Sequence, residues 1–368
     1  MADRPGVGFV DLPAQYADVE EEIVAAIADL VHRGAFVGGP VVADFEARLA
    51  DYVGVRFAVG CSDGTSSLML SLLAEGMRAG DVAIIPANTY VATANAVIQA
   101  GGSVAVVDCD PQTYLIDLNQ LADALAGGAK FILPVHLYGN PCPMAELTAL
   151  ADRFGAKIVE DNAQAIGASV AGRRTGSFGL AAGVSFYPTK NLGSFGQGGA
   201  VLTSDQKLAD TVRMYVEQGQ GADRHHHDVV GYNARLHAIQ ACVLGKLLGK
   251  LDGFNAARLR AADWYARQLP AERIQKRTEG ATHVYHLLEF RCHSSEHRQK
   301  VADALKAAGI GFGYHYPVPV HKQAAYPELN GLSFPVAERL ADTLISLPMH
   351  PCLTEQQVQA VCDVVLGT

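Results

Sequence analysis

The segment from Ser185 to Asp205, SFYPTKNLGSFGQGGAVLTSD, places a lysine where covalent chemistry is feasible. Lys190 lies just past a run typical of a buried strand, close to the hydroxyl of Ser185 and ahead of a glycine-rich turn. Burial lowers the pKa of a lysine because it disfavours the charged form, and a neutral amine attacks an aldehyde. The segment therefore predicts that Lys190 forms a Schiff base. The alternative is an ordinary lysine in a surface loop.

A second segment, VEDNAQAIGA from Val159, places a carboxylate at the carboxyl end of a predicted strand. A carboxylate that faces a pyridine nitrogen keeps that nitrogen protonated, and the ring then withdraws electrons. Asp161 can supply this group, about thirty residues before Lys190. Taken alone, Asp161 is equally well explained as a helix N-cap.

A third segment, CSDGTSSLMLSLLAEG from Cys61, is a turn of small residues that opens a helix. Backbone N–H groups at a helix N-terminus, together with nearby hydroxyl groups, bind a phosphate monoester well. Gly64, Thr65 and Ser66 are the predicted phosphate cradle. Small polar residues also open most helices simply as caps, so this segment is weak evidence by itself.

The elements that must position these residues follow an alternating pattern. Helical periodicity runs from about residue 18 to 75, and short strand-like runs then start near residues 82, 103, 130, 156 and 182, separated by helical segments. This rhythm predicts an α/β fold with a parallel sheet and with ligand-binding loops at the carboxyl ends of the strands. One long helix is expected from about 235 to 269. We expect a large domain over residues 1–249 and a smaller α+β domain over residues 250–368.

Composition excludes several classes of protein. The 368 residues carry a formal net charge of −9 without a basic run, which disfavours broad binding to nucleic acid, and no apolar stretch is long enough to span a bilayer. The seven scattered cysteines predict reduced thiols in a cytosolic protein. No metal site is expected, because the consecutive His225, His226 and His227 cannot all face one ion from an extended segment.

These segments, in this order, resemble the nucleotide-sugar aminotransferases of the DegT family, and the resemblance runs over nearly the whole chain. Further matching segments are FVGGPVVADFE at 36, IIPANTYVATANAV at 84, VDCDPQTYLID at 107, PVHLYGNP at 134, GYNARLHAIQACVL at 231, HVYHL at 283, HYPVPVHKQAAY at 315 and FPVAERLADTLISLPMHPCLTEQQV at 334. The resemblance implies a fold-type I aminotransferase large domain, a homodimer with shared active sites, and pyridoxal 5'-phosphate (PLP) as cofactor.

The resemblance also implies roles for particular residues around that cofactor. Lys190 would form the Schiff base, Asp161 would bind the ring nitrogen, and Gln164 would lie near the ring hydroxyl. Tyr90 would stack on the ring. The expected phosphate ligands are Gly64, Thr65 and Ser185, joined by Asn233 from the partner subunit.

Two of these expectations have simpler alternatives. Asn233 can instead cap a helix that begins near Arg235. From the segment HYPVPVHKQAAY we expect Tyr316, His321 and Lys322 to bind substrate; the alternative for His321 and Lys322 is exposed polar residues.

The sequence departs from the family pattern at Ile166, where a histidine is common, at Gln197, where an acidic residue is usual, and at His237, where Asp or Ser is usual. None of these removes a group that transamination needs, but each affects the expected shape of the substrate pocket.

The predicted reaction moves an amino group from glutamate to a keto group, at C3 rather than C4, of a nucleotide-linked deoxy sugar, with dTDP as the expected nucleotide. The runner-up substrate is a free keto-cyclitol. A non-catalytic regulatory protein is a further alternative, which the presence of both Lys190 and Asp161 disfavours.

Overall fold

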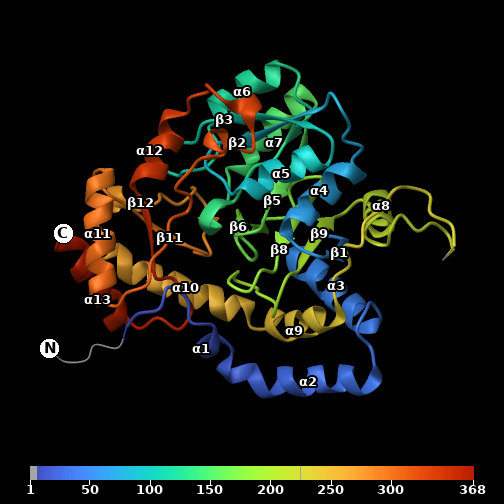
Figure 1. The fold of residues 1–368 in the computed structure, drawn as a ribbon, viewed down its shortest axis with the longest axis horizontal. Coiled ribbons are helices and arrows are strands. Elements are labelled where there is room, and N and C mark those ends of the chain that lie inside the picture. The colour runs from blue at the N-terminus through green and yellow to red at the C-terminus, as the bar shows by residue number, and fades with distance from the viewer. Residues whose placement is uncertain (1–5, 224) are drawn as a thin grey trace.

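The computed structural model describes residues 6–223 and 225–368, and its centre is a seven-stranded sheet (Figure 1). The strand order is β1-β9-β8-β5-β4-β2-β3. The strands span β1 Phe57–Cys61, β2 Val82–Pro86, β3 Ser103–Val107, β4 Phe131–Ile132, β5 Lys157–Asp161, β8 Ala181–Ser185 and β9 Gly199–Thr203. Pairing from β8 through β5, β4 and β2 to β3 is parallel, so the expected α/β fold with a mostly parallel sheet is confirmed.

Two strands of this sheet differ from the expectation. β9 pairs antiparallel with both β8 and β1, and β1 lies inside the stretch for which we predicted only helices. The residues of β1, FAVGC, include no charged or strongly polar side chain and are mostly buried, so they show none of the polar alternation that marks a half-exposed strand.

Helices cover both faces of the sheet because successive strand residues point to opposite sides. In β2, Ala83 and Ile85 pack with residues of α4 and α5, whereas Ile84 packs with residues of α6 and α7. The helices of this part are α1 Leu12–Tyr16, α2 Glu20–Arg33, α3 Pro40–Val53, α4 Gly64–Ala74, α5 Val91–Gln99, α6 Leu118–Ala126, α7 Met144–Phe154 and α8 Gln206–Val216.

The long helix expected after residue 235 is two helices, α9 Ala238–Leu248 and α10 Leu251–Ala266. The break falls at Gly249 and Lys250, and glycine is a poor helix former. α9 packs on α2 and α3, whereas the second half of α10 packs into the C-terminal core.

The C-terminal elements gather on one side of the molecule, drawn at the left of Figure 1. They comprise β11 Leu288–Arg291, α11 Ser295–Ala307, α12 Pro335–Thr343, β12 Leu344–Leu347 and α13 Glu355–Leu366. β11 and β12 pair antiparallel, and a small sheet elsewhere joins β6 Ser169–Val170, β7 Arg173–Arg174 and β10 Ala281–Thr282. The boundary at residue 249 stays a prediction, because Val320 and Ala337 pack into the cores of the large sheet.

Candidate active site

A cavity of about 510 Å³ lies where the loops after several parallel strands meet the N-terminus of α4. It brings together most of the residues that the sequence singled out. Those that line it are Gly64, Thr65, Tyr90, Asp161, Gln164, Ser185, Lys190 and Tyr316.

Lys190 reaches this cavity from the turn that follows β8. Its backbone N–H donates to the carbonyl of Tyr187 at 2.8 Å, which holds the turn. The side chain is half-buried, and burial lowers the pKa of its amine to about 8 although the charge of Asp161 opposes this shift. Roughly a tenth of the lysine is therefore neutral and nucleophilic at pH 7, far more than for a lysine with its ordinary pKa of 10.5.

His286 is the nearest polar neighbour of this amine, and its role was not predicted from the sequence. Its Nε2 lies 3.5 Å from Lys190 Nζ, and its Nδ1 lies 3.2 Å from Asn191 Oδ1. Asn191 Nδ2 donates to Asn255 Oδ1 and to the Val284 carbonyl, so its Oδ1 is the atom free to accept from His286. The proton of His286 therefore resides on Nδ1, and Nε2 presents a lone pair to Lys190.

The backbone of His286 is fixed by a buried arginine. Arg258 Nη1 donates to the carbonyls of Met349, Tyr285 and His286, at 2.7, 3.3 and 3.5 Å. Burial, followed by the charges of Lys190 and Arg258, holds the pKa of His286 well below its usual range. His286 thus stays neutral and keeps its acceptor. The motif HVYHL was the available signal, but nothing in it shows which of its two histidines has a partner, or what that partner is.

Asp161 ends β5 and points into the cavity from the sheet. Its carboxylate accepts a hydrogen bond from Thr93 Oγ1 at 2.8 Å and one from the Ala163 N–H at 3.2 Å. Burial raises the pKa of Asp161 above its usual value despite these donors and the nearby charge of Lys190. A buried carboxylate in this condition suits a cationic partner such as a protonated pyridine nitrogen.

The N-terminus of α4 forms one wall of the cavity beside Ser185. A Cβ added at Gly64 would lie 2.6 Å from Ser185 Cβ, so the close approach of this first helical turn to β8 requires glycine. Asp63 caps the helix by accepting from the Ser66 N–H at 2.9 Å and from the Ser66 hydroxyl at 2.7 Å. Gly64 and Thr65 line the cavity, whereas Ser66 is engaged by the cap and is not among the lining residues.

Two aromatic side chains and an amide also line the cavity. Gln164 Oε1 accepts from the Tyr138 N–H at 2.6 Å, and its Nε2 donates to the Tyr316 hydroxyl at 2.9 Å. The rings of Tyr316 and Tyr90 lie 5.3 Å apart, and Tyr90 is 55% exposed. Tyr90 therefore offers an exposed aromatic ring at the cavity wall.

The structure does not bring His321 and Lys322 to the cavity. His321 is buried with its Nε2 2.9 Å from Glu338 Oε1, and Lys322 Nζ lies 3.3 Å from the same oxygen. The expectation that both face substrate is therefore unsupported, because Glu338, seventeen residues further along the chain than His321, already pairs with them.

Asn233 is exposed and outside the cavity of its own chain. The alternative role as a cap is wrong, because α9 begins at Ala238 with His237 as its N-cap residue.

Of the positions that depart from the family pattern, only Gln197 lines the cavity; Ile166 is buried in the core and His237 is exposed. The three consecutive histidines are exposed too. Within residues 6–223 and 225–368 no group of histidine, cysteine or acidic side chains could hold a metal ion.

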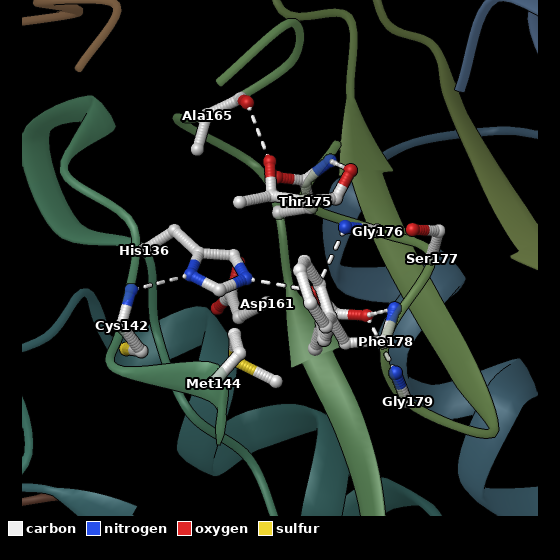
Figure 2. Close-up of polar contacts among 12 residues, drawn as sticks. His136, Cys142, Met144, Asp161, Ala165, Thr175, Gly176, Ser177, Phe178 and Gly179 are labelled. Atoms are coloured by element: carbon white, nitrogen blue, oxygen red, sulfur yellow. Dashed lines mark hydrogen bonds and ion pairs between the residues drawn. The ribbon is translucent and has the colours of Figure 1, made fainter. Parts of the chain in front are cut away.

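Behind the cavity, Glu160 forms a buried polar network on the other face of β5, and Figure 2 shows this network. His136 Nδ1 accepts from the Cys142 N–H at 3.0 Å, so Nε2 carries the proton and donates to Glu160 Oε2 at 2.9 Å. The carboxylate also accepts backbone N–H groups of Gly176, Phe178 and Gly179, at 2.8, 2.7 and 2.7 Å. This network anchors the loop after β7 and the segment after β4 to the strand that carries Asp161.

The fold and the lysine-carboxylate cavity define a fold-type I PLP-dependent aminotransferase. The model of the DegT/DnrJ/EryC1/StrS aminotransferase family matches residues 17–366, and the chain belongs to this family. No helix in the described part of the chain is both long and apolar enough to cross a membrane.

The chain is similar to named relatives over almost its full length. It is 38% identical to UDP-N-acetyl-3-dehydro-α-D-glucosamine 3-aminotransferase of Acidithiobacillus ferrooxidans, over 100% of this chain and 99% of that protein. It is 39% identical to dTDP-3-amino-3,4,6-trideoxy-α-D-glucose transaminase of Streptomyces venezuelae, over 99% and 96%. The crystal structure of S. venezuelae DesV superposes with a TM-score of 0.92, at 39% identity, covering 98% of both chains.

The cofactor of the enzyme is PLP. The described residues fit it: a lysine with a lowered pKa, a buried carboxylate suited to a cation, and a helix N-terminus beside a serine lie around one cavity. When bound there, PLP supplies the carbonyl group that an amine attacks and a ring that withdraws electrons.

Proposed function

We propose that this aminotransferase transfers an amino group from glutamate to the C3 keto group of a nucleotide-linked sugar. The shared cavity of Lys190, Asp161 and the α4 N-terminus carries the proposal that the chain catalyses transamination. The two relatives described above, whose names specify amination at sugar C3, support the substrate class and the position. Seven free cysteines, most of them buried, fit a protein that works in the cytoplasm.

In this proposal each cavity residue has a defined task. Lys190 would hold the cofactor in the resting enzyme and, once released, would act as the base and acid that removes or returns a proton at the substrate carbon bearing the nitrogen. Its amine is suited to both tasks because its pKa is lowered to about 8. Asp161 holds a proton at the pyridine nitrogen, and Gly64, Thr65 and Ser185 bind the phosphate.

The aromatic and polar side chains of the cavity orient the reacting groups. Tyr90 covers one face of the cofactor ring, while Gln164 holds Tyr316 in place at the cavity wall. His286 accepts a hydrogen bond from Lys190 and so fixes where the amine points. Gln197, which also lines the cavity, is positioned to contact substrate.

The proposed role of Lys190 is tested by Lys190→Ala. After borohydride reduction and denaturation, the wild-type protein should retain PLP as a label on the peptide containing Lys190, and glutamate added before the reduction should prevent this labelling. The Lys190→Ala protein should give neither result. A borohydride-stable label in this variant would show that another lysine holds the cofactor.

Substrate class is tested separately with a panel of keto substrates and glutamate. We expect turnover with 3-keto sugars linked to dTDP or UDP, and none with a free keto-cyclitol. Turnover with the cyclitol alone would establish the runner-up substrate while leaving the assignment of Lys190 intact.

We further propose a homodimer in which Asn233 of one subunit completes the phosphate site of the other. Asn233 is exposed and is not among the residues that line the cavity of its own chain, and both observations support this arrangement. Mixing inactive Lys190→Ala and inactive Asn233→Asp subunits should restore roughly a quarter of the sites, because half the dimers are then mixed and each has one intact site. Absence of recovery would show that Asn233 serves its own subunit.

A further inference from the structure

A second cavity, of about 990 Å³, lies among the C-terminal elements and is nearly twice the size of the first, 510 Å³. Its walls come from the end of α10, the segment 271–277, the end of β11, α12 and the loop 111–114 that follows β3. It shares no lining residue with the cavity of Lys190. The proposed transamination therefore leaves this cavity without a role.

Positive charge is concentrated in this cavity, although the whole chain has a net charge of −9. The cations that line it are Arg273, Lys276, Arg277, Arg291 and Arg339, whereas Glu272 is the one acidic lining residue. Among the described ion pairs, only Arg277 of these cations has a carboxylate partner, Asp263 at 2.8 Å. The like charges repel one another unless an anion lies between them.

Two of these guanidinium groups are oriented by uncharged partners. Arg291 donates to the Glu272 carbonyl at 2.8 Å and to the Pro111 carbonyl at 3.2 Å, and Arg273 donates to the Arg291 carbonyl at 3.0 Å. Carbonyl oxygens fix the direction of a guanidinium group and leave its charge uncompensated. Each arginine also keeps further N–H donors for another acceptor.

The segment 271–277, which carries three of these cations, is tied to the loop that follows β3. Gln275 Nε2 donates to the Thr113 carbonyl at 2.6 Å, and the Lys276 N–H donates to the Gln112 carbonyl at 2.9 Å. These two bonds hold the segment 271–277 against that loop. A site held in this way loses little conformational freedom when it binds a ligand.

We propose that this cavity binds a diphosphate group, either free or as part of a nucleotide. Four cations without a carboxylate partner match the several negative charges of a diphosphate, and the planar donors of arginine suit phosphate oxygens. A monocarboxylate would leave most of the positive charge unbalanced. Lys276 and Arg339 are exposed at the cavity, and Lys276 Nζ, which donates to Gln112 Oε1 at 3.3 Å, keeps further donors for a ligand.

One connection links the two cavities along the chain. Tyr285 lines the basic cavity, and the next residue, His286, lines the cavity of Lys190. Arg277 contacts the Tyr285 hydroxyl and also pairs with Asp263. A diphosphate that draws Arg277 toward itself would therefore act on the segment that positions His286.

The test is calorimetric titration of inorganic pyrophosphate into the PLP-loaded protein at low salt. Wild type should bind at this site, and Lys276→Gln/Arg339→Gln should lose about tenfold or more in affinity because two charged donors are removed. The matched control is Lys207→Gln/Arg260→Gln, which removes the same charge from exposed positions outside the cavity lining. The control should stay within about twofold of wild type, and salt should weaken binding.

Three results would overturn the proposal: no binding to wild type, equal loss in both double variants, or an unchanged affinity in Lys276→Gln/Arg339→Gln. The last would place pyrophosphate elsewhere, for example in the substrate site. If the double variant fails to fold, Arg339→Glu alone reverses one exposed charge and should reduce affinity at least as much as Arg339→Gln. A parallel titration with a nucleoside diphosphate separates the two ligand sources, since it carries the same two phosphate groups as pyrophosphate and tighter binding therefore indicates contacts to the nucleoside.

Discussion

Glu160 and Asp161 are adjacent carboxylates in β5, but they point to opposite faces of the strand and have different numbers of hydrogen-bond donors. Glu160 has four hydrogen-bond donors around it, three of them backbone N–H groups (Figure 2). Asp161 has two, and burial raises its pKa. A buried charge with enough donors holds structure together, whereas one with too few is available to a ligand that brings the missing charge.

The largest effect should come from Asp161→Asn, a change in charge with almost no change in shape. We expect turnover to fall by on the order of 10²–10³-fold, because a neutral amide cannot hold a proton at the pyridine nitrogen. Steady-state kinetics at saturating PLP measures the loss. Near-normal turnover would refute the role of Asp161.

The same variant should not destabilise the cofactor-free protein. A carboxyl whose folded pKa is raised contributes stability at pH below its ordinary value of 3.8, and this contribution is lost as pH rises through the folded pKa. An asparagine at this position cannot ionise, so the variant does not lose stability as pH rises. Without cofactor, the melting temperature of Asp161→Asn should therefore equal or exceed that of wild type at pH 8. The difference should shrink as pH falls toward 4. A clearly lower melting temperature at pH 8 would mean that Asp161 also supports the fold.

Glu160→Gln should show the opposite pattern. A glutamine amide turns one acceptor into a donor that faces other donors, which should lower the free energy of unfolding by about 2–3 kcal/mol. Turnover of the folded protein should remain close to wild type, because Glu160 lies on the face of β5 away from the cavity. Chemical denaturation and kinetics on the same preparation measure both quantities. A turnover loss as large as that of Asp161→Asn would contradict the purely structural role of Glu160.

A smaller effect is expected from His286→Phe. Because His286 Nε2 accepts from the protonated amine of Lys190, its removal should lower the pKa of that amine from about 8. The rate at which the cofactor-free protein captures PLP, measured by absorbance from pH 6.5 to 9.5, reports the fraction of neutral amine. The midpoint of this rate–pH curve should lie near pH 8 in wild type and at a lower pH in His286→Phe. The midpoint for His286→Gln should lie between the two. A midpoint that stays or rises would contradict the proposed hydrogen bond.

Parts of the site were predictable because neighbouring residues carry the signal. Lys190 and Asp161 each come at or just past the end of a strand-like run, and the α4 N-terminus has a distinctive series of small residues. Parallel strands bring their carboxyl ends together, so the topology predicts that these groups meet there. Strand β9 was missed because its glycine-rich approach resembles a loop, and β1 because its small buried residues show no alternation.

Other parts could not be predicted, since they depend on contacts between distant segments. His286 contacts Lys190 although the two are 96 positions apart in the sequence, and no residue near His286 in the sequence indicates that it is a partner of the amine. The basic cavity gathers cations from three segments of the chain, each unremarkable alone. Nothing in the sequence indicated that His321 and Lys322 have an ion-pair partner, because that partner, Glu338, lies on α12.

The burial of Val7 has a consequence for how the chain is made. Val7 packs into the C-terminal core and forms a bridge with Ile310, and its carbonyl accepts from the Gly311 N–H at 2.8 Å. A ribosome adding 5–20 residues per second reaches Ile310 roughly 15 to 60 s after it has passed Val7. During synthesis the segment around Val7 therefore has no Ile310 to pair with while the strands of the central sheet are translated. Val7 can be buried only after the C-terminal segment has been translated, so closure of this core must be among the last folding events of a nascent chain.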